Sequence, residues 1–424
     1  MNFILLMILL SAFFQNIIGY LKFRKIINPI SLFSLIHFFH NWSFSLSRFF
    51  DENILWIADL DVSYLSMYEV LNINLLGSWA YFFVIIFFAK TKQFTRLIQI
   101  ENSEILKYSY YLLTSIYFLR FIINYDINVL YGANQALDSI SAFNPISQIL
   151  FLRVPLILTY FFTKKINRSD LIKIIFIEVF LSFLMFRRKD LVYILSATFI
   201  KFLISSKINL RMVFNNIFFV ALSFIFLMFV PIYRSLNYID NLSLKIIETF
   251  ALIGEYGSTI FFYIINLSNS EGVQNWTYQL IQNNEMNVLL GKSYIQAFIN
   301  MFILRPFQGD SISGWQAAYY FKSYAYPDVT STGYDFSFAA EAILNFGQQY
   351  AFISFIFLGL IISFFYSNRN KSDFYQTLYM STWPILIIGF RTDSTSILRV
   401  YSYFIFIYLL FYFSEQLKTN KRIN

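Results

Sequence analysis

The sequence contains no cysteine, which excludes disulfide bonds, thiolate catalysis and cysteine-ligated metal sites. Histidine occurs only at His37 and His40, so the ligands that a catalytic zinc ion needs are lacking. The glycine-rich phosphate-binding motifs are absent, as is the nucleophile motif GxSxG, and the cytoplasmic loops expected below are too short for a nucleotide-binding domain. We therefore expect no metal ion, no cofactor and no ATP-driven transport by this chain alone.

Charged residues are also scarce, at 13% of 424 residues, whereas 58% are hydrophobic. Apolar runs long enough to cross a membrane recur from end to end, and the ten-residue alternation of barrel strands is missing. The sequence predicts an all-α polytopic integral membrane protein, with residues 1–424 as a single membrane domain of about 11 transmembrane helices. The expected spans are 3–21, 29–47, 71–89, 106–123, 146–163, 170–186, 190–205, 213–232, 348–366, 376–390 and 396–413.

Basic residues orient these spans. No positive charge precedes the first apolar run and three basic residues follow it, so we expect a retained first span, an N-terminus outside and a C-terminus inside. Residues 233–347 then form one large external, periplasmic loop with amphipathic helices near 250–267 and 288–304; if both crossed, the count would rise to about 13 with the same orientation. The net charge of +8 is explained by basic residues in the inside-facing loops and at sites that bind anionic membrane lipid, and not by binding to nucleic acid.

Arginine predominates over lysine on the expected outer side, with nine arginines and four lysines, against six and thirteen inside. Positively charged residues normally remain on the cytoplasmic side when a membrane protein inserts, so arginines on the outer side call for a reason. A planar guanidinium binds two phosphate oxygens at once, so these arginines are candidate phosphate ligands. The structural alternative is that several of them pair with Asp190 or Asp393 at the membrane edge. The outer set is Arg48, Arg120, Arg153, Arg187, Arg188, Arg234, Arg305, Arg391 and Arg399.

Two carboxylates stand near the end of the large loop, in the stretch TSTGYDFSFAAEAILNFGQQYAF. Helix-forming residues run from Phe336 to Phe346, and Asp335 is expected to cap this helix or to lie just before it. Glu341 falls within the helix among apolar residues, where an unpaired carboxylate is costly. It is either one half of an ion pair with an outer arginine or a group that faces a substrate.

Four segments carry a resemblance to a known family: 187–195, which begins in FRRKDLV; 291–310; 333–347, GYDFSFAAEAILNFG; and 389–400, which contains GFRTDSTSILR. With the hydropathy plan of the whole chain, they resemble the bacterial Wzy-type polymerases of oligosaccharide repeat units, which build O-antigen or capsular polysaccharide. The resemblance implies a GT-C-like membrane glycosyltransferase in the bacterial inner membrane. It implies undecaprenyl-pyrophosphate-linked oligosaccharides as substrates at the outer face, with a chain-length regulator and a flippase as partners.

Such a transfer has two chemical requirements, and neither needs a metal ion. The departing pyrophosphate has to be stabilised, for which the candidates are Arg187, Arg188, Arg305, Arg391 and Arg399. The acceptor hydroxyl has to lose its proton, for which the candidates are Glu341, Asp335 and, behind them, Asp310.

Two other classes remain open at this point. An O-antigen ligase shares the plan and the chemistry, but a ligase is expected to carry a histidine in the large external loop, and this loop has none. A flippase or other transporter predicts internal repeats and charges at the middle of the membrane, whereas the charge here is concentrated at the outer face.

Overall fold

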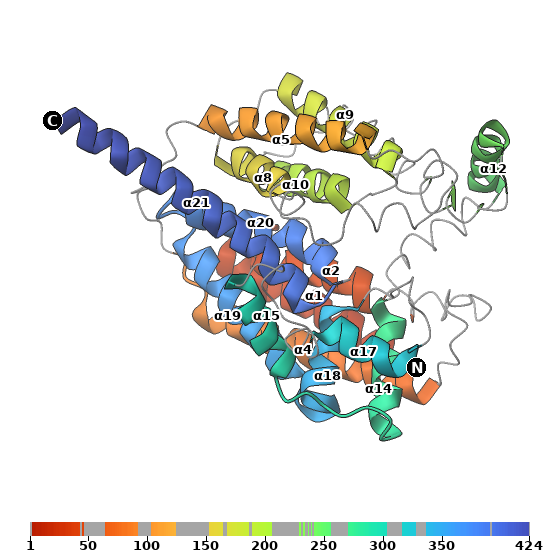
Figure 1. Ribbon diagram of the computed structural model, residues 1–424. Coiled ribbons are helices and arrows are strands. Elements are labelled where there is room, and N and C mark those ends of the chain that lie inside the picture. The colour runs from red at the N-terminus through yellow and green to blue at the C-terminus, as the bar shows by residue number, and fades with distance from the viewer. Residues whose placement is uncertain are drawn as a thin grey trace. The chain divides into compact units, whose positions relative to one another are not determined.

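The computed structural model describes residues 2–42, 64–91, 103–123, 152–163, 168–185, 189–205, 241–255, 270–302, 316–327, 336–390 and 392–423, with Ser45 and a few isolated positions between 229 and 239. These residues form 15 α-helices and no strand, which confirms the all-helical prediction for them (Figure 1). The chain divides into two compact units, Met1–Ile98 with Ile265–Ser402, and Gln99–Ile264 with Tyr403–Asn424.

The first unit is built on two apolar helices, α4 (Tyr64–Phe88) and α19 (Phe352–Asn368), which pack side by side (Figure 1). Glycine permits this close approach. A Cβ atom at Gly77 would lie 2.6 Å from the ring of Phe355, and one at Gly359 would lie 3.0 Å from Val84. Three further helices, α1 (Asn2–Phe23), α2 (Pro29–Asn41) and α20 (Asp373–Gly389), complete this part of the unit.

Within the described part of the chain, two helices are long and apolar enough to cross a membrane, over Phe3–Phe23 and Leu65–Phe88. At 1.5 Å per residue, the 21 residues of the first reach about 30 Å, the thickness of a hydrocarbon core. Within the predicted span over 29–47, the structure describes the 13-residue helix α2, and residues 43, 44, 46 and 47 lie outside the described part of the chain. The backbone leaves helical geometry at Trp42, where the C-cap forms.

The predicted span over 213–232 lies almost wholly outside the described residues. Other predicted spans match helices with shifted ends, among them α5 (Ser103–Ile123), α8 (Arg153–Thr163), α9 (Arg168–Met185), α10 (Lys189–Ser205) and α21 (Ser394–Ile423). Of these, α5, α8, α9 and α10 pack together in the second unit, which also contains α12 (Leu242–Glu255).

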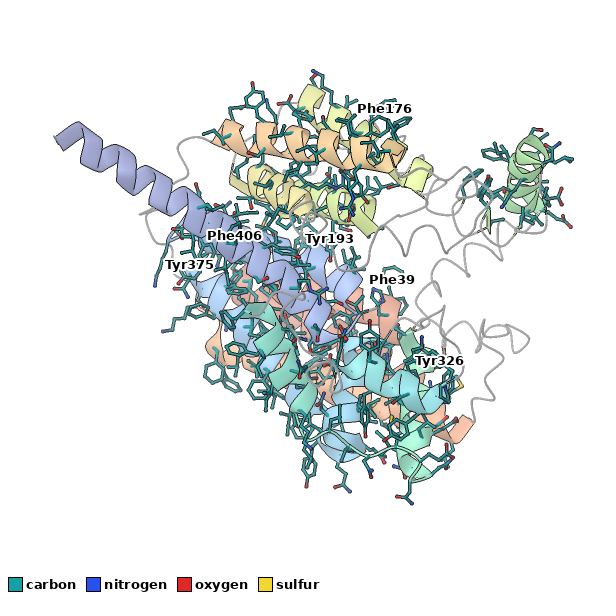
Figure 2. The ribbon with its side chains drawn as sticks, viewed as in Figure 1. Phe39, Phe176, Tyr193, Tyr326, Tyr375 and Phe406 are labelled. Carbon is teal, nitrogen blue, oxygen red and sulfur yellow. The ribbon has the colours of Figure 1, made fainter. Side chains whose placement is uncertain are left out.

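Most of the described residues of the expected external loop in the first unit are helical. This part of the loop contains α14 (Ser270–Gln282), α15 (Lys292–Phe302), α17 (Ala317–Ala325) and the start of α18 (Phe338–Tyr350). A buried apolar cluster joins α14, α17 and α18, and includes Val273, Leu280, Phe321, Phe336, Ala340 and Leu344. Figure 2 labels Tyr326 beside this cluster, where its ring centroid lies 5.8 Å from that of Trp276.

Candidate functional site

Glu341 lies in the first turn of α18. The helix begins after Ser337, whose Oγ accepts a hydrogen bond of 3.0 Å from the backbone N–H of Ala340. The N-cap is thus Ser337 and not Asp335, which was expected to cap the helix or to lie just before it and which itself lies outside the described residues. The helical geometry breaks at Gly347, whose φ of 67° is open to glycine without strain, and α19 follows.

Three hydrogen bonds hold the carboxylate of Glu341. Its Oε1 accepts from Ser293 Oγ at 2.5 Å and from Ser394 Oγ at 2.7 Å, and its Oε2 accepts from the backbone N–H of Ser394 at 2.6 Å. Asn345, one turn later on α18, donates to Ser293 Oγ at 2.7 Å. The site therefore joins α15, α18 and the N-terminus of α21, where the helix dipole favours a negative charge.

The Glu341 side chain is completely buried, with 0% of its surface exposed. Among the residues that the structure describes, its donors are hydroxyl and backbone groups and not the outer arginine proposed as its ion-pair partner. Burial and the nearby negative charge of Asp393 raise the pKa of the Glu341 carboxyl, the hydrogen bonds from Ser293 and Ser394 oppose both effects, and the resulting pKa is about 7. A carboxyl with a pKa near neutrality can both take up and release a proton at physiological pH.

Asp393 is the second buried carboxylate at this site. Its Oδ1 accepts from the backbone N–H of Ser396 at 3.1 Å and caps α21, and its Oδ2 accepts from Gln316 Nε2 at 2.9 Å. The sequence analysis treated Asp393 as a possible arginine partner and not as a member of the site. The negative charge of Asp393 disfavours the charged form of Glu341 and so helps to raise the pKa of Glu341.

The remaining predicted site residues are mostly outside the described part of the chain. This holds for the carboxylates Asp335 and Asp310 and for the arginines Arg187, Arg188, Arg305 and Arg391. Arg399 is described. It is partly buried on α21, in the second turn after Ser394, and its carbonyl accepts from Ser402 Oγ at 2.7 Å.

Sequence reasoning missed Ser293, Ser394 and Asn345, because single hydroxyl and amide residues give no motif. A weak signal was available for Ser293. It shares a helical face with Gln296 and Asn300 in the segment that was predicted to be amphipathic, and all three are buried.

A network of amide side chains from three other helices contacts the N-cap of α18. Gln274 of α14 donates to Asn41 of α2 at 2.6 Å and accepts from Asn74 of α4 at 2.7 Å. The same Gln274 amide lies 3.4 Å from Ser337 Oγ, the cap of α18. Because buried polar groups are costly to leave unpaired, this network fixes α2, α4, α14 and α18 in one register.

A further buried carboxylate, Glu271, begins α14 and was not singled out from the sequence. Its Oε1 accepts from the backbone N–H of Ser45 at 3.2 Å and also from the Ser45 hydroxyl. Ser270, beside it, donates to the carbonyl of His40 and contacts Ser337 through its own carbonyl at 3.4 Å. These contacts tie the start of α14 to the end of α2.

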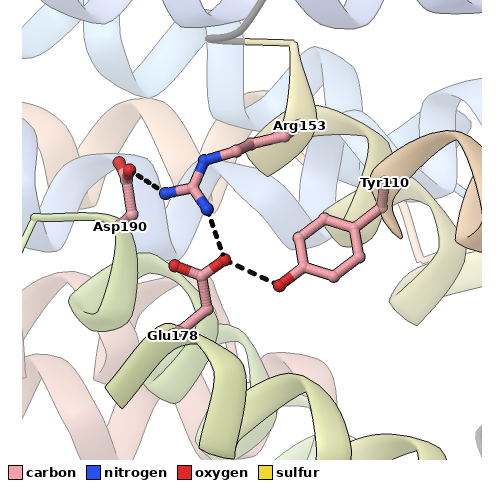
Figure 3. A network of polar contacts seen from close by, with 4 residues as sticks. All are labelled: Tyr110, Arg153, Glu178 and Asp190. Carbon is pink, nitrogen blue, oxygen red and sulfur yellow. Dashed lines mark hydrogen bonds and ion pairs between the residues drawn. The ribbon is translucent and has the colours of Figure 1, made fainter. Parts of the chain in front are cut away.

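In the second unit, Arg153 of α8 lies in a buried network with Glu178 of α9 and Asp190 of α10 (Figure 3). One guanidinium nitrogen of Arg153 donates to Glu178 Oε1 at 2.8 Å, and the other donates to Asp190. Tyr110 of α5 donates to the same Glu178 oxygen at 2.7 Å. Both arms of the fork are therefore engaged by carboxylates, so the structural alternative applies to Arg153 and not the phosphate-binding one.

The chain matches no protein-family model, no curated protein and no solved structure.

Proposed function

We propose that the protein is a membrane glycosyltransferase that polymerises lipid-pyrophosphate-linked oligosaccharide repeat units, with undecaprenyl-pyrophosphate as the lipid carrier. The observation that carries this proposal is the Glu341 site. A carboxyl with a pKa of about 7 is buried at the start of α18, which leads directly into the apolar helix α19. This is a proton acceptor placed beside a membrane-type helix, as the deprotonation of an acceptor hydroxyl requires.

In this mechanism, the proton leaves the acceptor sugar through Ser394. Glu341 is 0% exposed, whereas Ser394 is 7% exposed as a residue, and its hydroxyl donates directly to Glu341 Oε1. Ser394 Oγ takes the proton of the sugar hydroxyl and passes its own proton to Glu341. The sugar oxygen then forms a bond to the anomeric carbon of the donor chain, and the bond to the pyrophosphate breaks with its electron pair on the pyrophosphate oxygen.

The wider topology belongs to the same proposal. The chain has about 11 spans in the bacterial inner membrane, and residues 233–347 face the periplasm, where lipid-linked repeat units are joined. Two helices of membrane-spanning length and composition support a membrane location. The pyrophosphate is bound by arginines from the set Arg187, Arg188, Arg305, Arg391 and Arg399, with a flippase and a chain-length regulator as partners.

Purified protein in proteoliposomes tests this function directly. With lipid-pyrophosphate-linked repeat units as the only substrate, a polymerase yields a ladder of longer lipid-linked chains. A ligase makes no such ladder and transfers sugar only after a second acceptor, lipid A core, is added. A transporter moves the lipid-linked unit between leaflets and forms no new glycosidic bond.

Arginine-to-lysine substitutions test the pyrophosphate ligands. Lysine keeps the positive charge but cannot bind two phosphate oxygens through a planar fork, so at least one of the five substitutions is expected to abolish the ladder at normal protein level. The five are Arg187→Lys, Arg188→Lys, Arg305→Lys, Arg391→Lys and Arg399→Lys. The readout is chain length on a gel of lipid-linked products. Arg153→Lys serves as the comparison, because Arg153 binds carboxylates and not substrate. Full-length ladders from all five predicted arginine positions after substitution would refute the clamp.

The pH dependence tests the base. Since the carboxyl has to be deprotonated to accept a proton, kcat/KM is expected to rise with pH through an apparent pKa of about 7. Asp393→Asn removes the charge that helps to raise this pKa, so the rise is expected to move to lower pH. Asp373→Asn makes the same chemical change at a residue that does not contribute to the Glu341 pKa, and should leave the profile in place. A profile that is unchanged in Asp393→Asn would contradict the role of Glu341.

A further inference from the structure

In helix α15 the polar face is buried and the apolar face is exposed, which is the opposite of a water-exposed helix. Its polar residues Gln296 and Asn300 are only 3% and 8% exposed, whereas Phe298 and Phe302 are 58% and 69% exposed. Ser293 is buried on the polar face and Ile295 is exposed on the apolar one. A helix on the surface of a soluble protein turns its apolar stripe to the core and its polar face to water.

Specific contacts hold the polar face inward. Ser293 donates to Glu341, and Gln296 Nε2 donates to Asn300 Oδ1 at 2.9 Å. The hydroxyl of Tyr294 lies 2.7 Å from that of Ser354, on α19. The Gln296–Asn300 bond lies within α15, but the bonds of Ser293 and Tyr294 reach other helices. Rotating the helix to hide its phenylalanines would break those two bonds and leave buried polar groups unpaired, so the apolar face has to point outward.

The apolar surface continues beyond α15. Leu290, two residues before the helix, is exposed, and α19, which α15 contacts through Tyr294 and Ser354, exposes Phe357 and Phe364. The N-terminal residue of α15, Lys292, is exposed as well. An apolar face with a lysine at one end matches the lipid boundary, where acyl chains cover the apolar side chains and headgroup phosphates attract the ammonium group.

We propose that α15 is embedded in the outer leaflet of the membrane, with lipid acyl chains against Ile295, Phe298 and Phe302. Its 11 residues extend about 16 Å, roughly half of the hydrocarbon thickness, so the helix enters the membrane without crossing it. On its inner side Ser293 binds Glu341. Helix α15 therefore lies between the Glu341 site and the lipid, and this placement does not depend on which reaction the site carries out.

Site-directed spin labelling tests this placement, because the chain has no cysteine to replace beforehand. A nitroxide is attached at Phe298→Cys, at Phe302→Cys and, as a third outward position, at Ile295→Cys. The control is Ser323→Cys on α17, an exposed polar position. Each protein is reconstituted into vesicles of phosphatidylethanolamine and phosphatidylglycerol, and its helicity is compared with that of the unlabelled chain by circular dichroism.

The measured quantity is the ratio of collision rates of the nitroxide with oxygen, which concentrates in the bilayer, and with a water-soluble nickel chelate. We expect a several-fold higher ratio at the three α15 positions than at Ser323. Equal ratios at all four positions would show that α15 faces water and would overturn the proposal. Exclusion of both reagents from the α15 positions would also overturn it, because a protein surface would then cover this face. Neither readout uses glycosyl transfer, so failure of the proposed function would leave the result intact.

Discussion

Replacing Glu341 with glutamine is expected to lower the rate of repeat-unit transfer by about 10²–10⁴-fold, the usual contribution of a general base. Glutamine has nearly the same shape, and its carbonyl oxygen can still accept from Ser293 and Ser394. It has no basic oxygen to take up a proton, and its amide N–H₂ would oppose the backbone N–H of Ser394, which now donates to Oε2. The measurement is the initial rate of dimer formation from lipid-linked repeat units in proteoliposomes.

Three comparisons separate the base from its surroundings. Glu69→Gln makes the same chemical change in the same unit, at a carboxylate that accepts from Gln348, and is expected to keep its activity. Ser394→Ala removes the proposed proton carrier and should lose most of the rate, whereas Ser293→Ala removes only a supporting donor and should lose little. Near-normal polymer from Glu341→Gln would move the role of the base to Asp335 or Asp310.

Arg153→Met is expected to produce the largest loss of stability, about 3–5 kcal/mol, because it removes one partner of a buried ion pair and leaves the other charged. Arg153 is 3% exposed and Glu178 is fully buried, so water does not replace the lost partner. The guanidinium also lies 4.7 Å from the centre of the Tyr117 ring. This is a cation–π contact, which the uncharged methionine side chain cannot make. Unfolding in detergent, followed by circular dichroism against denaturant concentration, measures the change.

A double substitution identifies the cause of that loss. Combining Arg153→Met with Glu178→Leu removes the two buried charges and leaves only Asp190, which is 22% exposed. It should recover a large part of the stability, since a buried pair exchanged for apolar residues is often neutral. Glu104→Gln is the surface comparison. Glu104 pairs with Lys107 at 2.7 Å but is 41% exposed, so its loss should cost less than about 1 kcal/mol. A cost for Arg153→Met as small as that for Glu104→Gln would show that the network is not a stabilising one.

The sequence by itself determined the helical class and the place of Glu341. Apolar length and the lack of strand alternation predicted the helical class, but no helix was predicted where α14 and α17 lie. The run of alanine and leucine around Glu341 predicted the helix that became α18 to within a few residues. These properties depend on periodicity and local propensity, which neighbouring residues decide. The same local signals also pointed to an amphipathic segment where α15 lies, but not to which face would be buried.

Only the tertiary structure decided the partners. Ser293 and Ser394 lie 48 and 53 residues from Glu341 in the chain, and no local pattern brings them to one carboxylate. Arg153 looked like the other outer arginines, yet Glu178 and Asp190, on two different helices, occupy its guanidinium. The polarity of α15 was reversed for the same reason. Leaving the buried Glu341 carboxylate without hydrogen-bond donors would cost more free energy than leaving the phenylalanines of α15 in contact with lipid.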